Sequence, residues 1–196
     1  MASINRINKA LLAENIDKQV IDKIIGDDGD LINVIKRMDE MLAPDVKYKI
    51  LDLCACCTKS SKSHKIAKDY GRVMAEKSLQ EKINGLAGAV FYADCVTLNN
   101  DNTLTVHFCW DVNGNKTCSC CDIKAPIIAG KLLAKNKKVA VDDRVMPLSY
   151  CFCCAGHFRY HLQNALGIKL KTKEIVSSPI NSKGEKPCEF ILEIVG

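Results

Sequence analysis

The spacing of the hydrophobic residues changes once along the chain, near residue 86. From residue 3 to about residue 86, apolar residues recur every three or four positions, which is typical of helices that bury one face. Two such runs are Ile16, Val20, Ile21, Ile24 and Ile25, followed by Leu31, Ile32, Ile35, Met38 and Leu42. The pattern therefore predicts four or five short helices in this part of the chain.

Turn-forming residues mark where these helices end. The stretch 26–30 is rich in glycine and aspartate, and Asp30 is a suitable N-cap for the helix that follows it. Pro44 suits the first turn of the next helix, because a proline there loses no hydrogen bond. After residues 58–61 we expect one further helix, which runs to about Gly85.

The second half has the composition of β-strands. Residues 89–110 contain two β-rich runs around 99–102, which predicts an antiparallel hairpin, and residues 168–178 and 187–195 predict a second one. Between the hairpins we expect a cysteine loop at 113–121, a short helix near 125–135, and a helix from about Gly156 to Leu166 that ends at Gly167.

This order of elements predicts an α+β fold. N-terminal helices are followed by an antiparallel sheet of about four strands, in two hairpins, that packs on helices. We expect residues 1–196 to form one compact domain, with a helical part at 1–86 and a cysteine-rich α+β part at 87–196.

Charge and hydropathy argue against two classes of partner. The formal net charge is +5, but basic and acidic residues are mixed in both halves, with 15 against 13 in residues 1–86 and 13 against 10 in residues 87–196. A nucleic-acid-binding face is therefore not expected. No run of 18 apolar residues occurs and the N-terminus lacks a signal-peptide pattern, so we expect a cytoplasmic protein that does not enter a membrane.

The twelve cysteines are the most unusual feature of the sequence. In a reducing compartment we expect thiols rather than a disulfide framework. Nine of the twelve lie in three copies of the pattern Cys-x-Cys-Cys, which are Cys54, Cys56 and Cys57, then Cys118, Cys120 and Cys121, and finally Cys151, Cys153 and Cys154. Each copy contains a C-x-x-C pair, a common zinc-binding arrangement.

Two copies together could supply four thiolates to one zinc ion. We prefer Cys118, Cys121, Cys151 and Cys154 as the ligands, and Cys120, Cys153 and Cys188 are the candidates that could take part in addition. The 29 residues between Cys121 and Cys151 exceed the spacing of a typical zinc ribbon, so the fold would have to bring the pairs together. The alternative is that these cysteines are small buried hydrophobic residues without a metal.

The histidines near the third copy suggest other chemistry. His157 and His161 are one helical turn apart, but Phe158 stands where a zinc protease needs its glutamate. Cys154 with His157 could form a thiol nucleophile at a helix start, which keeps a cysteine-dependent or metal-dependent hydrolase or transferase as the alternative function. Arg159 and Lys169 could meet an anionic ligand.

The last 45 or so residues resemble a known family. The features are Cys154-Ala155-Gly156 at the start of a helix, Leu166-Gly167 at its end, a strand at 168–177, the run from Gly184 to Cys188, and a last strand at 190–195. This order is similar to the C-terminal signature of 4-vinyl-reductase-type small-molecule-binding domains.

The resemblance implies an α+β domain with a buried cavity for a small, often apolar molecule. Some phenol-sensing relatives also hold a structural zinc through cysteines and a glutamate, and their last cysteine corresponds to Cys188. The other two positions of that site fall on Ile180 and Ser177, which cannot replace a thiolate and a carboxylate.

The resulting hypothesis is a sensor or carrier for a small apolar or aromatic molecule, with zinc as its metal. The chain contains no nucleotide-binding motif and no output domain. A sensor of this kind would act through a regulatory protein partner or a second copy of itself in a homodimer.

Overall fold

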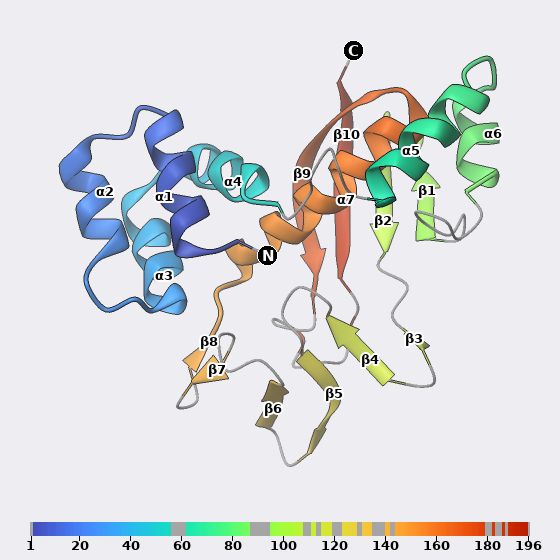
Figure 1. Ribbon diagram of the computed structural model, residues 1–196. Helices are drawn as coiled ribbons and strands as arrows, with labels where there is room; N and C mark the ends of the chain where they lie inside the picture. Colours follow the sequence, from blue (N-terminus) through green and yellow to red (C-terminus); the bar gives the residue numbers. More distant parts are fainter. Residues whose placement is uncertain are drawn as a thin grey trace.

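The N-terminal helices and the strands occupy different regions of the molecule (Figure 1). The computed structural model describes residues 2–55, 62–86, 95–107, 111–112, 115–118, 123–128, 131–134, 140–141, 144–178, 182, 186 and 188–195, with the backbone alone between 111 and 145. Helices α1 (Ile4–Ala13), α2 (Lys18–Ile25), α3 (Leu31–Met41) and α4 (Pro44–Leu53) gather on one side. Helices α5 (Lys62–Val73), α6 (Leu79–Asn84) and α7 (Cys151–Leu166) lie beside the main sheet.

The main sheet has four antiparallel strands, in the order β1 (Val96–Leu98), β2 (Thr103–His107), β10 (Glu189–Val195) and β9 (Lys169–Ser177). The two hairpins expected from the sequence form this sheet, because β1 pairs with β2 and β9 pairs with β10. Strand β9 lies at one edge. The α+β fold is thus confirmed.

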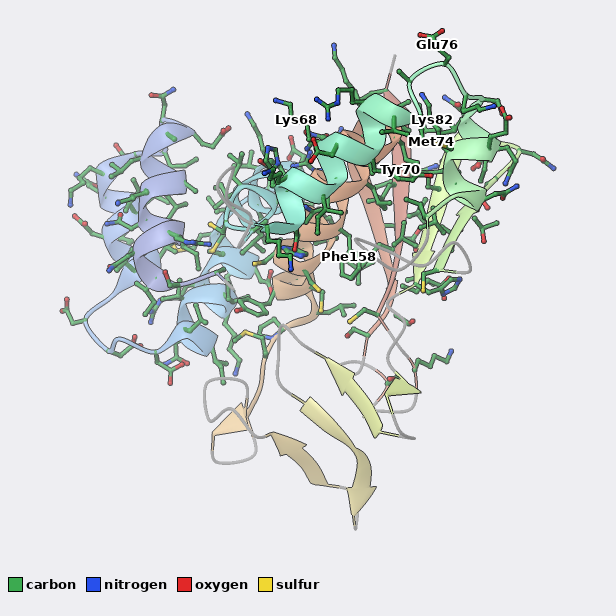
Figure 2. The ribbon with its side chains drawn as sticks, turned by 45° about the vertical axis from the view of Figure 1, so that its right-hand side comes forward. Lys68, Tyr70, Met74, Glu76, Lys82 and Phe158 are labelled. Carbon is green, nitrogen blue, oxygen red and sulfur yellow. The ribbon has the colours of Figure 1, made fainter. Side chains whose placement is uncertain are left out.

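The core extends from the N-terminal helices to the main sheet, and part of it lies between α7 and that sheet. Leu104, Phe190 and Leu192 are fully buried on the sheet, and the ring of Phe158 on α7 lies 5.5 Å from that of Phe190. On the far side of α7, the hydroxyl of Tyr70 on α5 donates a hydrogen bond to the carbonyl oxygen of Lys82 on α6, and Figure 2 shows the two residues together. His64 on α5 stacks on Tyr160 of α7, so α7 is packed between α5 and the main sheet.

The helix ends expected from the sequence are present. The side chain of Asp30 accepts hydrogen bonds from the backbone N–H groups of Ile32 and Asn33, and Pro44 occupies the first turn of α4. Helix α7 ends at Gly167, whose φ of 69° lies in the left-handed region that glycine adopts without strain.

Three sequence predictions were wrong in detail. The helix expected from residues 58–61 to Gly85 is divided, because Ser78 and Glu81 form a capping box that starts α6. Helix α7 begins at Cys151, five residues before the expected start at Gly156. The helix expected near 125–135 is absent, since β5 (Ile123–Ile128) and β6 (Lys131–Ala134) pair there as antiparallel strands.

These strands belong to a second sheet that the sequence did not predict. Its order is β3 (Asp111–Val112), β4 (Asn115–Cys118), β5 and β6. The cysteine loop expected at 113–121 was therefore wrong for Asn115–Cys118, which pair as a strand with β5. A short pair, β7 (Ala140–Val141) with β8 (Arg144–Val145), and a 3₁₀ turn at Leu148–Tyr150 lead from this region to α7. In the described residues, no helix has the length and apolar character needed to cross a membrane.

Candidate functional site

The third Cys-x-Cys-Cys copy forms the first turn of α7 and is buried. Cys151, Cys153 and Cys154 are all at most 4% exposed. The sulfur of Cys153 accepts a hydrogen bond from the backbone N of Ala2 at 3.1 Å and contacts the carbonyl oxygen of Cys54 at 3.6 Å. Cys153 therefore packs α7 against the N-terminal helices, whereas Cys151 and Cys154, three residues apart, share a different helix face.

The predicted zinc ligands are only partly within the described residues. Cys118 is the last residue of β4 and its side chain is not described, while Cys120 and Cys121 lie outside the described residues. Cys188 is buried just before β10. Among the described side chains, no group of three or more histidine, cysteine or acidic residues is placed to hold a metal. The shared zinc site stays a prediction.

The described cysteines differ in oxidation state. Cys54, Cys151, Cys153, Cys154 and Cys188 are reduced, whereas Cys95 is disulfide-bonded. The expectation of thiols throughout is therefore wrong at Cys95. Burial raises the pKa of the Cys54 thiol to about 11, in spite of the opposing effect of Arg6, so this cysteine is a poor nucleophile at neutral pH.

The alternative nucleophile, Cys154, does not lie in front of a helix as expected. It lies within the first turn of α7, is only 4% exposed, and packs in the hydrophobic core. His157 follows on the same helix, and its ring centroid lies 4.6 Å from that of His161. A nucleophile must reach its substrate, and this burial argues against such a role for Cys154.

Three histidines and a tyrosine form a cluster between α5 and α7. His64 on α5 stacks on Tyr160 at 5.3 Å, and Tyr160 meets the edge of His161 at the same centroid distance. His161 is 2% exposed, and burial, together with the nearby His157 and His64, lowers its pKa to about 4. At neutral pH His161 is therefore an uncharged residue of the core.

A pocket of about 570 Å³ opens between α4, α7 and β9. This volume falls within the range of pockets that hold small ligands. Its lining comes from both parts of the chain, namely Pro44, Asp45, Tyr48, Lys49 and Asp52 on α4, Phe152 and Arg159 on α7, Leu170, Lys171, Thr172 and Lys173 on β9, and Glu193 on β10.

An aromatic pair supplies the apolar wall of this pocket. The rings of Tyr48 and Phe152 stack in parallel, with centroids 3.8 Å apart and an interplanar angle of 4°. A second pocket of about 200 Å³ borders on the same two rings and on Lys173, and it continues to Ile175 along β9. The two pockets share Tyr48, Phe152 and Lys173, and we refer to them together as the β9 groove.

A hydrogen-bonded ion pair lies beside the aromatic pair. Arg159 donates from Nε and Nη2 to the carboxylate of Asp52 at 2.5–3.0 Å, and the hydroxyl of Thr172 donates to the same carboxylate at 3.0 Å. Nη1 of Arg159 also donates to the side-chain oxygen of Gln163. Both charged side chains are less than one-fifth exposed, so water screens their attraction only weakly. Together with Thr172, the pair joins α4, α7 and β9.

Gly156 allows α4 and α7 to approach closely at this point. A Cβ atom at Gly156 would lie 2.6 Å from the carbonyl oxygen of Asp52 and 3.0 Å from its Cα. Such distances are too short for non-bonded atoms, so only glycine fits without moving one of the helices. The motif Cys154-Ala155-Gly156 therefore has a packing role here.

Few of the residues that line the groove could be identified from the sequence. Arg159 was considered as a partner for an anionic ligand, but in the structure its guanidinium is bound to Asp52. Tyr48 and Phe152 follow the apolar pattern of their helices and carry no local signal that they meet. Only the packing of helices 100 residues apart brings them together.

Comparison with known protein families, with curated proteins and with solved structures finds no match to this chain.

Proposed function

We propose that this protein binds a small apolar or aromatic molecule in the β9 groove and acts as a sensor or a carrier. The observation that carries this proposal is the pocket of about 570 Å³ with the stacked rings of Tyr48 and Phe152 on its wall. A flat ligand can bury apolar area against these rings, and ring stacking adds to that gain.

The position of the groove suits a sensor. Its walls come from α4 of the N-terminal helices and from α7 and β9 of the α+β part. A ligand that contacts both parts favours the arrangement in which they are held together. A regulatory partner, or a second copy of the chain, could then respond to that arrangement.

The resemblance to 4-vinyl-reductase-type domains points to the same class of ligand. It rests on the region from Cys154 to Val195, which supplies α7, β9 and β10 and thus most of one side of the groove. Structural zinc through Cys118, Cys121, Cys151 and Cys154 remains part of this proposal, as an element that would tie the cysteine-rich strands to α7.

The test is ligand-induced stabilisation across a panel of phenol, benzoate, indole and tetrapyrrole fragments. A compound at 100 times its Kd should stabilise the fold by about 2.7 kcal/mol and raise the Tm by roughly 5–10 °C. The variant Tyr48→Leu should reduce the shift, whereas Tyr70→Phe, located between α5 and α6, should not. Absence of a shift with every compound would contradict the proposal.

A further inference from the structure

Strand β9 forms one wall of the groove and lies at an edge of the main sheet. In the part of the chain that the structure describes, β9 pairs with β10 and with no other strand. An edge strand presents backbone N–H and C=O groups that point away from its sheet. These groups can form hydrogen bonds with the amide groups of a ligand, as they would with a neighbouring strand.

The groove runs along most of strand β9. The two pockets share Lys173 and together touch β9 continuously from Leu170 to Ile175. Five residue steps in an extended strand span about 16 Å. The opposite wall is α4 with Tyr48, so the space between them suits an extended ligand.

The charges along the groove are nearly balanced. Arg159 and Asp52 neutralise each other, and Lys49 is paired with Glu14 at 2.5 Å. Lys171 is the register partner of Glu193 on β10. This lining offers no concentrated charge of one sign, so it selects polar groups without net charge rather than a strongly anionic or cationic ligand.

From these three features we infer that the ligand is an uncharged aromatic amide, such as a short capped aromatic peptide. Its ring lies against Tyr48 and Phe152, and its amide N–H and C=O pair with the backbone of β9 between Leu170 and Ile175. This inference rests on the proposed function, because it names the class of molecule that the same groove takes. Main-chain pairing provides orientation, and the aromatic wall provides affinity.

The inference is tested with matched compounds by titration calorimetry. The parent compound is N-acetyl-phenylalanine methylamide, which has an aromatic ring and two amides. Its counterpart methylated on both amide nitrogens lacks the N–H donors, and N-acetyl-alanine methylamide lacks the ring. We expect either change to weaken binding at least tenfold, since the first removes the N–H donors of the main-chain pairing and the second removes the aromatic contact.

Hydrogen exchange locates the binding site on the protein. The parent compound should slow exchange of backbone amides between residues 170 and 175, and it should leave residues 96–98 of β1, the other edge of the sheet, unchanged. Equal affinity of the parent and N-methylated compounds would overturn the inference. If phenol or indole bound as tightly as the parent, the inference would fail and the proposed function would stand, whereas binding by none of the compounds would contradict both.

Discussion

Arg159 on α7 holds the carboxylate of Asp52 on α4 through its Nε and Nη2 atoms. This pair, with Thr172 on β9, joins α4 to two elements whose contacting residues lie more than 100 positions further along the chain. The β9 groove lies beside it, so the same contacts that fix α4 on α7 also set the shape of the groove.

Removal of Asp52 should destabilise the protein. In Asp52→Ala, Arg159 keeps its partly buried charge and loses its main partner, and hydrogen bonds to charged groups contribute about 1.5–3 kcal/mol. We therefore expect a loss of about 2–3 kcal/mol in the free energy of unfolding, measured with urea. The control is Asp69→Ala, which removes the exposed partner of Arg72 and should cost less than about 1 kcal/mol. Equal effects of the two substitutions would contradict this account.

Gly156→Ala should also destabilise the protein, although alanine usually favours a helix. In an ordinary helix interior the change stabilises by about 0.5–1 kcal/mol. At Gly156 the added Cβ would lie 2.6 Å from the carbonyl oxygen of Asp52, and the overpacking should cost about 1–3 kcal/mol. We therefore expect a lower Tm for Gly156→Ala. A higher Tm would contradict this account, because it would show that α4 and α7 can move apart at little cost.

The buried histidine His161 should make stability depend on pH. Its pKa in the folded protein is about 4, below the 6.5 of an unperturbed histidine, so below pH 6.5 the unfolded chain binds a proton that the folded chain does not. The stabilisation is complete above about pH 6.5 and is lost as the pH falls towards 4. We expect a loss of about 2 kcal/mol between pH 7 and pH 4.5.

The variant His161→Leu isolates this effect, because it removes the titrating group and keeps an apolar side chain between α5 and α7. Its free energy of unfolding should change by about 2 kcal/mol less than that of the wild type between the two pH values. His107→Gln, on the half-exposed histidine that pairs with Glu189, serves as the matched control. An unchanged pH profile in His161→Leu would assign the acid sensitivity to other groups.

The predicted zinc site is tested by elemental analysis of protein purified without added metal. The prediction is about one zinc ion per chain, lost in both Cys118→Ser and Cys151→Ser, together with a lower Tm, because a structural metal contributes to folding free energy. Cys54→Ser is the control and should keep its zinc, because Cys54 is a buried thiol outside the predicted ligand set. If the protein contains no zinc and both variants keep the wild-type Tm, the zinc site is contradicted and these cysteines act as small buried hydrophobic residues.

Local sequence signals predicted most of the main fold. The cap at Asp30, Pro44 at the start of α4 and Gly167 at the end of α7 depend on neighbouring residues only, and all three are present. The capping box of Ser78 and Glu81 was equally local and was overlooked. Residues 125–135 were misassigned because a short apolar run fits a helix and a strand about equally well.

The groove could not be predicted in this way. Tyr48 and Phe152 meet because Gly156 lets α4 approach α7, and neither residue has a distinctive neighbour in sequence. The cysteine repeats were visible, but the direction of a helical side chain depends on where the helix begins. The start of α7 at Cys151, rather than Gly156, turns Cys153 towards Ala2 and Cys54 and places all three cysteines of that copy in the interior.

The central claim, that an aromatic molecule binds in the β9 groove, is tested most directly by photo-cross-linking. The probe is a phenyl trifluoromethyl diazirine, and the labelled peptides are identified by mass spectrometry with and without excess indole or N-acetyl-phenylalanine methylamide as competitor. We predict labelling of peptides that contain Tyr48, Phe152 and residues 170–175, removed by the competitor and reduced in Tyr48→Leu. Competed labelling that falls only on peptides outside these three regions would contradict the claim.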